Sequence, residues 1–313
     1  MFPKEQRELE KRAGIVGLGL MGQAFTSNLL QAGFTLQGFD IDASRMKEFK
    51  VQGGTPVSSA ARGARGARWV LTSLPNSTVV REVVLGSGGV AEGAEEGLLL
   101  ADTTTSRPED SVSLGAELSR RGIRFLDAAV SGTSTMAWKK DLIVVAGGES
   151  ADFEACRPLF GGFAKAAYHL GPVGSGALTK LIINLVLACN RLGLAEGLVL
   201  GMKAGMNLES LLAALKDGAA GSKAMDQKGE MMITGIYTPE SRLTTTQKDV
   251  RLMLEQGQRY GTPMFVTGIY SQIVQAGVQM GYGEIDPACF IEVLRGLAGL
   301  PHRKQEGDRA KPK

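Results

Sequence analysis

Short apolar runs alternate with helix-like segments along the first half of the chain. Apolar runs of this length are typical of buried strands. We therefore expect strands at residues 13–16, 34–39, 67–74, 97–102 and 123–126. Helices are expected at 23–31, at 79–85 and from Pro108 onward, the last with Ser106 as its candidate N-cap. Repeated strand–helix units predict a parallel sheet whose ligands bind at the carboxyl ends of its strands.

The second half of the chain shows helical periodicity without strand-like alternation. Helices are expected at 207–215, 223–233, 245–256, 264–279 and 286–294. Between the two halves, Gly174 to about Gly205 is predicted to form one long apolar helix. Its central part resembles a membrane span, but polar and charged residues interrupt it. A soluble interdomain helix is therefore the better interpretation.

The segment from Gly17 to Gly22 has the spacing G-x-G-x-x-G between an expected strand and an expected helix. There the glycines make a tight turn and admit a pyrophosphate, and the N-terminus of the helix faces its negative charge. The motif therefore predicts a dinucleotide site. Its residues are Gly17, Leu18, Gly19, Leu20, Met21 and Gly22.

Asp40 ends the second expected strand, 18 residues beyond Gly22. An acidic residue near this spacing takes the ribose hydroxyls of the cofactor. Because a carboxylate there repels a 2′-phosphate, NAD is favoured over NADP. Arg45 is the counterweight, since it could reach such a phosphate if the loop folds back. NADP therefore stays open.

Residues suited to bind the cofactor or its substrate lie at the carboxyl ends of three other expected strands. Leu74, Pro75 and Thr105 are candidates for cofactor binding, and Ser131, Gly132 and Thr133, in the segment 127–133, for substrate binding. The carboxyl ends of parallel strands lie at one edge of a sheet, so these residues are expected where a nicotinamide ring and its substrate meet. Ser131, Gly132 and Thr133 would offer hydroxyls and backbone N–H groups to a substrate carboxylate.

Lys180 lies in the long apolar helix, four residues before Asn184. That spacing puts both side chains on one face of a helix, one turn apart. A lysine in such surroundings reaches out to water, pairs with a carboxylate, or has its pKa lowered toward the range useful for proton transfer. Gly174 and Gly176 would let a backbone or a ligand approach closely where the helix starts.

Composition narrows the class of protein. A length of 313 residues allows two domains, and a net charge of +3 from scattered basic residues calls for neither nucleic acid nor a membrane surface as a partner. Three cysteines, odd in number and far apart, indicate reduced thiols and a cytoplasmic location. With the two histidines they provide no metal-binding spacing, and the charged first residues do not form a signal peptide.

In combination and in this order, the motifs resemble those of the β-hydroxyacid dehydrogenases. This is the family of 3-hydroxyisobutyrate dehydrogenase, tartronate semialdehyde reductase, glyoxylate/succinic semialdehyde reductase and, more distantly, 6-phosphogluconate dehydrogenase. The resemblance covers residues 13–298 and includes Lys248-Asp249. It implies a Rossmann domain, a long connecting helix, and an all-helical second domain that helps to build dimers or tetramers.

The predicted fold class is α/β. A Rossmann domain with a parallel sheet is expected at 13–173, and an all-α domain at 174–303, beginning with the interdomain helix at about 175–204. Residues 1–12 and 304–313 are predicted to be disordered tails. A homodimer or homotetramer is the expected assembly.

The resemblance also implies roles for single residues. Lys180 matches the family's catalytic lysine, and Asn184 the asparagine that holds the substrate beside it. The other matches are Ser131 and Gly132 in the loop for the substrate carboxylate, Thr105 near the nicotinamide, and Lys248, which reaches the cofactor and closes the site.

Several positions depart from the family pattern. Ala129 replaces the usual proline, and Thr133 the last glycine, of the motif that binds substrate; Glu240 stands where glycine is usual. The segment 134–141 carries Trp138 followed by two lysines. These side chains would either narrow the pocket and attract a second acidic group, or form a solvated basic loop with one packed tryptophan.

The expected activity is reversible hydride transfer between a nicotinamide cofactor and a small β-hydroxyacid or its semialdehyde. Lys180 would serve as general acid or base and Asn184 would orient the same oxygen. Two other functions stay open. One is imine reduction, although related imine reductases generally lack a lysine at the position of Lys180. The other is a non-catalytic dinucleotide-binding scaffold, which loss of that lysine would favour.

Overall fold

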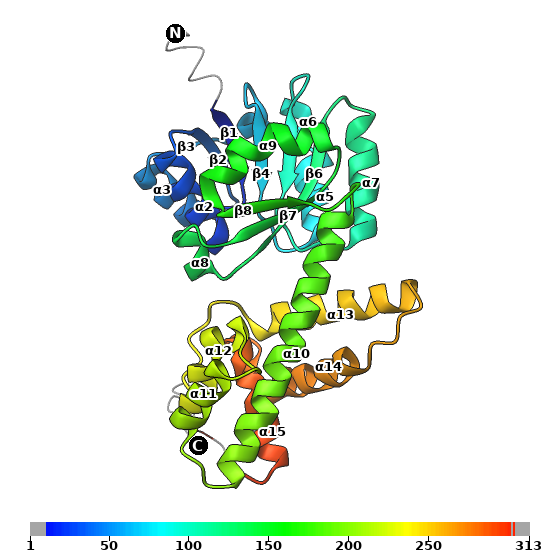
Figure 1. Ribbon diagram of the computed structural model, residues 1–313. Helices are drawn as coiled ribbons and strands as arrows, with labels where there is room; N and C mark the ends of the chain where they lie inside the picture. Colours follow the sequence, from blue (N-terminus) through cyan, green and yellow to red (C-terminus); the bar gives the residue numbers. More distant parts are fainter. Residues whose placement is uncertain (1–10, 302, 304–313) are drawn as a thin grey trace. The chain divides into compact units, whose positions relative to one another are not determined.

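The computed structural model describes residues 11–301 and 303, and the chain divides into two compact units between Lys180 and Leu181 (Figure 1). The predicted tails lie almost entirely outside the described residues. The first strand begins at Arg12, one residue before the predicted domain start. At the other end, the Arg303 guanidinium donates hydrogen bonds to backbone carbonyl oxygens of Met232 and Ile233, so Arg303 is placed against the second unit.

The first unit is built on one eight-stranded sheet with the order β3-β2-β1-β4-β5-β6-β7-β8. Neighbouring strands are parallel except β6 and β7, which are antiparallel. The strands are β1 (Arg12–Val16), β2 (Thr35–Phe39), β3 (Thr55–Pro56), β4 (Trp69–Thr72), β5 (Leu99–Asp102), β6 (Arg124–Ser131), β7 (Ile143–Gly147) and β8 (Ala166–His169). The strand order reverses at β1 and β4, which is where open α/β sheets bind their ligands.

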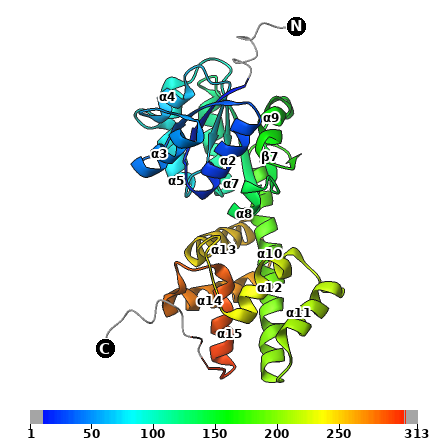
Figure 2. The same cartoon turned by 90° about the vertical axis from the view of Figure 1, so that its left-hand side faces the viewer.

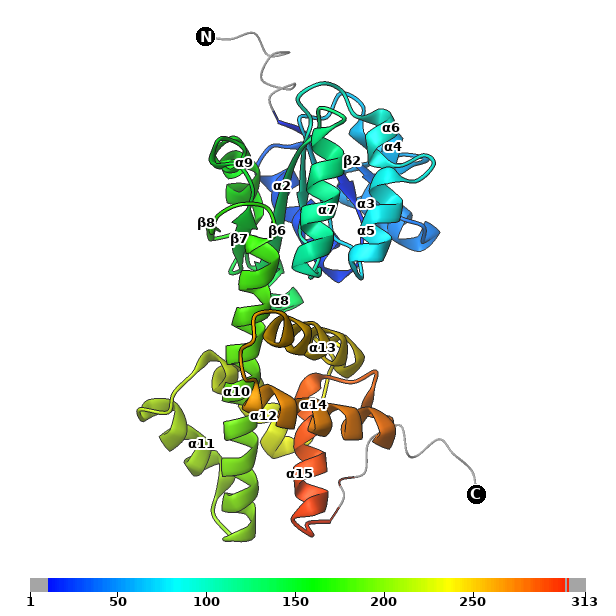
Figure 3. The same cartoon turned by 90° about the vertical axis from the view of Figure 1, so that its right-hand side faces the viewer.

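Helices cover both faces of this sheet (Figures 2 and 3). One core cluster joins the sheet to α2 (Leu20–Gln31), α3 (Ala43–Gln52), α8 (Ser134–Trp138) and α9 (Ser150–Phe163). The other joins it to α4 (Ala60–Ala64), α5 (Ser77–Leu85), α6 (Val90–Gly93) and α7 (Pro108–Ser119). The central strands β1, β4, β5, β6 and β7 are therefore largely buried on both sides, which explains why they read as continuous apolar runs.

The side chains of β5 show how one strand supplies both cores. Leu99 and Ala101 belong to one cluster, whereas Leu100, together with Leu98 just before the strand, belongs to the other. Successive side chains in a strand point to opposite faces. The predicted α/β fold class is thus confirmed.

Some predicted boundaries are wrong. Helix α2 starts at Leu20 and not at residue 23, because Gly19 already ends the turn as the N-cap. Strand β6 runs to Ser131 and not to residue 126, because its last residues pair with β7. The N-cap of α7 is Arg107, and the predicted cap Ser106 instead donates its hydroxyl to Asp102 Oδ2 at 3.5 Å.

The second unit is helical, as predicted, and its helices pack around one buried apolar cluster. The long helix α10 (Ser175–Lys203) starts in the first unit and continues into the second. It is followed by α11 (Leu208–Asp217), α12 (Lys223–Thr234), α13 (Leu243–Arg259), α14 (Phe265–Gly277), the π-helical turn η1 (Val278–Tyr282), the 3₁₀-helix η2 (Pro287–Phe290) and α15 (Ile291–Leu297). Asn207 and Asp286 cap α11 and η2 through their side chains.

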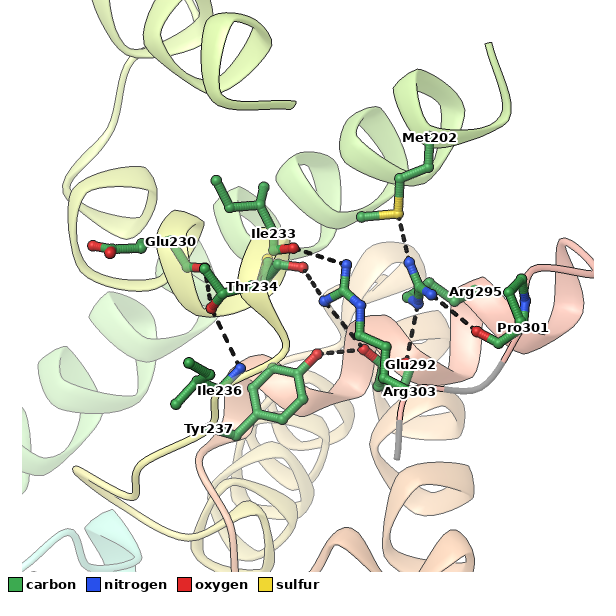
Figure 4. A network of polar contacts seen from close by, with 11 residues as sticks. Met202, Glu230, Ile233, Thr234, Ile236, Tyr237, Glu292, Arg295, Pro301 and Arg303 are labelled. Atoms are coloured by element: carbon green, nitrogen blue, oxygen red, sulfur yellow. Dashed lines mark hydrogen bonds and ion pairs between the residues drawn. The ribbon is translucent and has the colours of Figure 1, made fainter. Parts of the chain in front are cut away.

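A buried polar network holds the end of the described chain to this unit (Figure 4). The Tyr237 hydroxyl donates to Glu292 Oε1 at 2.5 Å, and Arg295 Nε donates to Glu292 Oε2 at 3.0 Å. Arg303 lies 3.6 Å from the same carboxylate. Burial, and then the hydrogen bond to Glu292, raises the pKa of Tyr237 far above its ordinary value. The tyrosine therefore serves as a neutral hydrogen-bond donor.

Helix α10 is the only helix of the described residues that is long and apolar enough to cross a membrane, judged by length and composition. The core helix of a soluble protein passes the same test. Leu192, Ala195 and Leu198 of this helix belong to the apolar cluster of the second unit. This packing fits the interpretation as an interdomain helix.

Candidate active site

The three glycines of the G-x-G-x-x-G motif have different surroundings in the structure. Gly17 has φ +92°, and a Cβ there would lie 2.2 Å from the Ser73 carbonyl oxygen. A Cβ on Gly22 would lie 2.0 Å from the Gly17 carbonyl oxygen. At Gly19, in contrast, the nearest described atom to a Cβ is Arg45 Nη1, at 3.8 Å. The first and third glycines are required by packing, whereas the second leaves its surroundings open.

The N-terminus of α2 lies directly behind this opening. Gly19 is its N-cap, and no side-chain hydrogen bond caps it. Backbone N–H groups at a helix start carry a partial positive charge and bind phosphate readily. The open face of Gly19 and these N–H groups therefore fit the pyrophosphate of a dinucleotide.

Gly19→Ala should leave the protein folded and weaken its cofactor binding. The added methyl group meets no described atom closer than 3.8 Å, but it occupies the space that a pyrophosphate needs. We expect the dissociation constant of NADH to rise about tenfold or more, with an unchanged melting temperature. Titration of NADH fluorescence and thermal unfolding measure the two quantities. Gly22→Ala is the matched comparison, because its methyl group would overlap the Gly17 carbonyl and lower the melting temperature.

Asp40 lies at the end of β2, as predicted, and its carboxylate braces the glycine turn. Oδ2 accepts a hydrogen bond from the Leu18 N–H at 2.7 Å, and Oδ1 accepts one from the Asp42 N–H at 2.9 Å. Arg45 Nη1 lies 3.4 Å from Oδ2. The Leu18 side chain is fully buried in the core, so only its backbone takes part in the turn. Arg45 thus lies beside both the turn and the acid that was expected to select the cofactor.

A buried carboxyl group, Asp102, organises the carboxyl ends of β4 and β5. Its Oδ1 accepts hydrogen bonds from the Thr72 hydroxyl at 2.8 Å and the Thr104 N–H at 3.1 Å. The Thr104 hydroxyl in turn accepts the Leu74 N–H at 3.1 Å. Burial raises the pKa of Asp102, and hydrogen bonds from threonine hydroxyls oppose that rise. Asp102 therefore shapes the segments that carry the predicted residues Leu74, Pro75 and Thr105.

The predicted carboxylate-binding residues lie between β6 and α8. Ser131 is the last residue of β6 and pairs with Ile143 of β7. Gly132 has φ +153°, and a Cβ there would lie 2.8 Å from Leu142 Cβ, so the turn requires glycine. The Thr133 hydroxyl accepts the Met136 N–H at 3.3 Å as the N-cap of α8. Of these three residues, Thr133 already uses its hydroxyl within the protein.

Trp138 and the two lysines after it are exposed at the end of α8, with Trp138 46% exposed. The helix is held to α2 by a hydrogen bond from Asn28 Nδ2 to the Ala137 carbonyl oxygen, at 2.7 Å. Of the two interpretations of the 134–141 segment, an exposed basic segment agrees with these exposures. The tryptophan is less packed than that interpretation assumed.

Asp127 joins the sheet to the start of the long helix. Its Oδ1 accepts the Gly174 N–H at 2.9 Å, and its Oδ2 accepts the Ala177 N–H at 2.7 Å. Its strand partner on β5 is Asp102. Burial is the main cause that raises the pKa of Asp127 to about 7. The hydrogen bonds from the Ala177 and Gly174 N–H groups lower the pKa, and the charge of Asp102 raises it.

The raised pKa predicts that Asp127 makes stability depend on pH. Its pKa is about 7 in the folded protein and 3.8 as the ordinary value, so the folded state holds this proton more tightly than the unfolded state. As the pH rises from about 4 to about 7, the free energy of unfolding should therefore decrease, by up to about 1.4 kcal/mol per pH unit. Urea unfolding of the parent and of Asp127→Asn at pH 5 and pH 8 measures this. Equal pH dependence in both proteins would refute it.

Lys180 and Asn184 lie one turn apart on α10, as their spacing predicted. Lys180 is partly buried. In the second unit, Asn184 Nδ2 donates a hydrogen bond to Asp249 Oδ2 at 3.1 Å, and Lys248 Nζ lies 3.3 Å from Asp249 Oδ1. Because the Asn184 NH₂ group donates to the Asp249 carboxylate, the carbonyl oxygen of the same amide points away from Asp249.

Sequence reasoning missed the roles of three carboxyl groups: Asp102, Asp127 and Asp249. Asp102 and Asp127 each follow an apolar strand run, and an acid at the end of a buried strand is a signal that was available. Asp249 lies 65 residues from its partner Asn184, and no local pattern reveals such a pair. The described residues contain no group of three or more Cys, His, Asp and Glu side chains arranged to hold a metal ion.

The strand order, the open glycine turn and the residues at the carboxyl edge define a dinucleotide-binding oxidoreductase of the Rossmann class. Residues 12–171 match the family model for the NAD-binding domain of 6-phosphogluconate dehydrogenase, and residues 174–294 match the model for the NAD-binding domain of NADP-dependent 3-hydroxyisobutyrate dehydrogenase. The chain belongs to the β-hydroxyacid dehydrogenase family, as its motifs predicted.

Named relatives are similar over nearly the whole chain. A 2-(hydroxymethyl)glutarate dehydrogenase of Eubacterium barkeri is 31% identical over 92% of this chain and 96% of its own length. Glyoxylate/succinic semialdehyde reductase 1 of Arabidopsis thaliana is 32% identical over 90% of this chain and 98% of its own length. The crystal structure of a 3-hydroxyisobutyrate dehydrogenase from Salmonella typhimurium matches with a TM-score of 0.83 at 25% identity, over 90% of this chain and 99% of that one.

Proposed function

We propose that this protein transfers a hydride reversibly between a nicotinamide cofactor and a small β-hydroxyacid or its semialdehyde, with Lys180 as general acid and base. The observation that carries the proposal is the place of Lys180. It lies on the first two turns of a helix whose start is hydrogen-bonded to Asp127, in the dinucleotide-binding sheet. When bound, the nicotinamide supplies or takes the hydride.

Lys180 handles the proton that accompanies the hydride. In the reducing direction, its ammonium donates a proton to the substrate oxygen as negative charge develops there; in oxidation, its neutral amine accepts the hydroxyl proton. Asn184, one turn along the helix, orients the same oxygen. The hydrogen bond from Asn184 to Asp249 fixes which way the amide faces.

The substrate carboxylate is proposed to bind at the end of β6. There the Ser131 hydroxyl and the backbone N–H groups of Gly132 and Thr133 are the donors. At Thr133 the backbone N–H is the donor to the carboxylate, since the Thr133 hydroxyl already caps α8. Holding the carboxylate fixes the distance between the carbonyl carbon and the nicotinamide, which is the main contribution of a positioning site.

NAD is the proposed cofactor, with NADP as the alternative. The Asp40 carboxylate lies where the ribose hydroxyls of a dinucleotide are expected, and it would repel a 2′-phosphate. Its bonds to the Leu18 and Asp42 N–H groups keep the carboxylate in that place. Arg45 lies 3.4 Å from it and is the residue that would hold a 2′-phosphate. Arg45→Ala should leave the KM for NADH within about twofold and raise that for NADPH.

Asp249→Asn tests the orientation of Asn184. An amide at position 249 leaves the Asn184 N–H an acceptor but removes the negative charge that fixes it, and it adds a competing donor. We expect kcat to fall about tenfold, with the dissociation constant of NADH unchanged. Asp226→Asn is the matched control, because Asp226 is an exposed acid of the same unit. An unchanged kcat in Asp249→Asn would remove Asp249 from the account.

The assay for the proposed function measures oxidation of NADH and NADPH with glyoxylate, succinic semialdehyde, methylmalonate semialdehyde and tartronate semialdehyde. Turnover with at least one of them is expected, and its rate relative to the others names the substrate. 2-(Hydroxymethyl)glutarate, the dicarboxylate in the name of the Eubacterium barkeri relative, is tested in the opposite direction, by reduction of NAD⁺. It tests whether the lysines of 139–140 attract a second acidic group. Tight cofactor binding without turnover of any substrate would contradict the proposal.

A further inference from the structure

We propose that Asp127 is a positioning residue for this reaction: from β6 it fixes the first turn of α10 and thereby sets the position of Lys180. The inference deepens the proposed function and depends on it only for the catalytic role of Lys180. The anchoring of the helix start stands on the geometry of the first unit.

The Asp127 carboxylate caps α10 from a distant part of the sequence. The first N–H groups of a helix have no partner within the helix. Oδ1 accepts the N–H of Gly174, and Oδ2 that of Ala177, at 2.9 and 2.7 Å. A carboxylate at this place also faces the positive end of the helix dipole. Asp127 therefore does for α10 what a side-chain N-cap does for α3 and α5.

Close packing leaves the helix start no room to shift. A Cβ on Gly176 would lie 2.2 Å from the Asp127 carbonyl oxygen. A Cβ on Gly147, which pairs with Asp127 across β6 and β7, would lie 2.6 Å from Asp127 Oδ1 and 2.9 Å from the Gly176 nitrogen. Lys180 is three residues, or about one turn, beyond Ala177. A movement of the first turn therefore reaches Lys180 directly.

The charge state of Asp127 bears on how well it holds both N–H groups. From β5 the carboxyl group of Asp102 faces it; from β7 it meets Gly147, and from α10 the two N–H groups, with Lys180 one turn further on. Burial raises the pKa of Asp127 to about 7. Protonation turns one accepting oxygen into a donor, so one N–H would lose its partner. Turnover through Lys180 should accordingly fall as pH drops below about 7.

The test combines hydrogen exchange with a double-mutant cycle. In Asp127→Asn, the NH₂ group of the amide replaces one of the two accepting oxygens. Two donors then face each other, and either the Gly174 or the Ala177 N–H loses its acceptor. We expect amide exchange in residues 174–181 to speed up about tenfold or more, and kcat to fall about tenfold or more. The dissociation constant of NADH should not change. Combined with Lys180→Ala, Asp127→Asn should lower kcat no further than Lys180→Ala alone.

Each outcome decides a separate point. Unchanged exchange at 174–181 would overturn the anchoring role. Faster exchange with additive losses of kcat would overturn the effect through Lys180, since a residue that only stabilises the fold gives additive losses. A third outcome combines faster exchange in Asp127→Asn with full turnover in Lys180→Ala. It would contradict the proposed function and still support the anchoring role of Asp127.

Two further variants complete the design. Asp102→Asn also removes a buried carboxylate from the neighbouring strand, but Asp102 bonds to Thr72 and Thr104, so exchange at 174–181 should stay as in the parent. If Asp127→Asn does not fold, Asp127→Ser takes its place, because its single short hydroxyl cannot accept both the Gly174 and the Ala177 N–H. Asp127→Ser should then show the faster exchange and the loss of kcat; parental values of both would overturn the proposal.

Discussion

Lys180→Ala is expected to lower kcat by about two decades or more, the usual size of an acid–base contribution. Without the ammonium group, the substrate oxygen must take its proton from water as the hydride arrives. The dissociation constant of NADH should remain that of the parent, because the glycine turn and α2 lie on other elements of the first unit. Steady-state kinetics and a fluorescence titration with NADH measure the two quantities.

Two variants separate the acid–base role from the positive charge and from the helix. Lys180→Arg keeps the charge, but arginine does not deprotonate near neutral pH and cannot act as a base; its kcat should stay low. Lys203→Ala removes an exposed lysine from the end of the same helix and should leave kcat unchanged. A Lys180→Ala protein with parental kcat would show that another group handles the proton.

Lys228→Met is expected to destabilise the second unit by about 3–5 kcal/mol. Lys228 is 1% exposed, and its ammonium lies 2.8 Å from Asp286 Oδ2 and 2.7 Å from Glu240 Oε2. Asp286 is fully buried, so removing the lysine leaves a buried carboxylate without its counter-charge. Urea unfolding followed by circular dichroism measures the loss.

Lys223→Met, at the exposed start of the same helix, is the matched control. It should change the free energy of unfolding by less than about 0.5 kcal/mol. A Lys228→Met protein as stable as this control would mean that the buried ion pair gives no net stabilisation. The prediction of a large loss would then be wrong.

The glycine motif shows what a sequence alone can predict. Its spacing, between an apolar run and a helical segment, correctly predicted the turn and the helix behind it, and the strand that precedes Asp40 was also predicted correctly. Local patterns specify such features because Gly17 is required by its backbone conformation and Gly22 by its contact with Gly17, five residues away. The start of α2 was missed by three residues, since nothing in the sequence showed that the helix begins at Leu20, directly after Gly19.

The end of β6 shows where local patterns fail. The sequence pattern predicts a strand that ends at residue 126, with the segment 127–133 beyond its carboxyl end. Residues 127–131 are extended because β7 pairs with them from the other side, and that pairing joins segments separated by the whole of α8. The antiparallel direction of β7 likewise depends on a contact that no short window of sequence contains.

Glu240 is a departure from the family pattern that the structure explains. Its carboxylate pairs with the buried Lys228, and its backbone N–H donates to Asp286 Oδ2 at 3.2 Å. These partners lie 12 and 46 residues away along the chain. The sequence identified Glu240 as unusual, but it could not reveal the charge that Glu240 compensates.

Transfer of deuterium from the cofactor to the product shows whether the protein moves a hydride to a small carbonyl acid. The protein would be incubated with NADH that carries deuterium at both hydrogen positions of nicotinamide C4, and with the semialdehyde that gives the fastest turnover. The product would be analysed by mass spectrometry. We expect a hydroxyacid one mass unit heavier, with the deuterium on the carbinol carbon, and almost no product from Lys180→Ala. Cofactor oxidation without deuterium in the product would contradict the proposed hydride transfer.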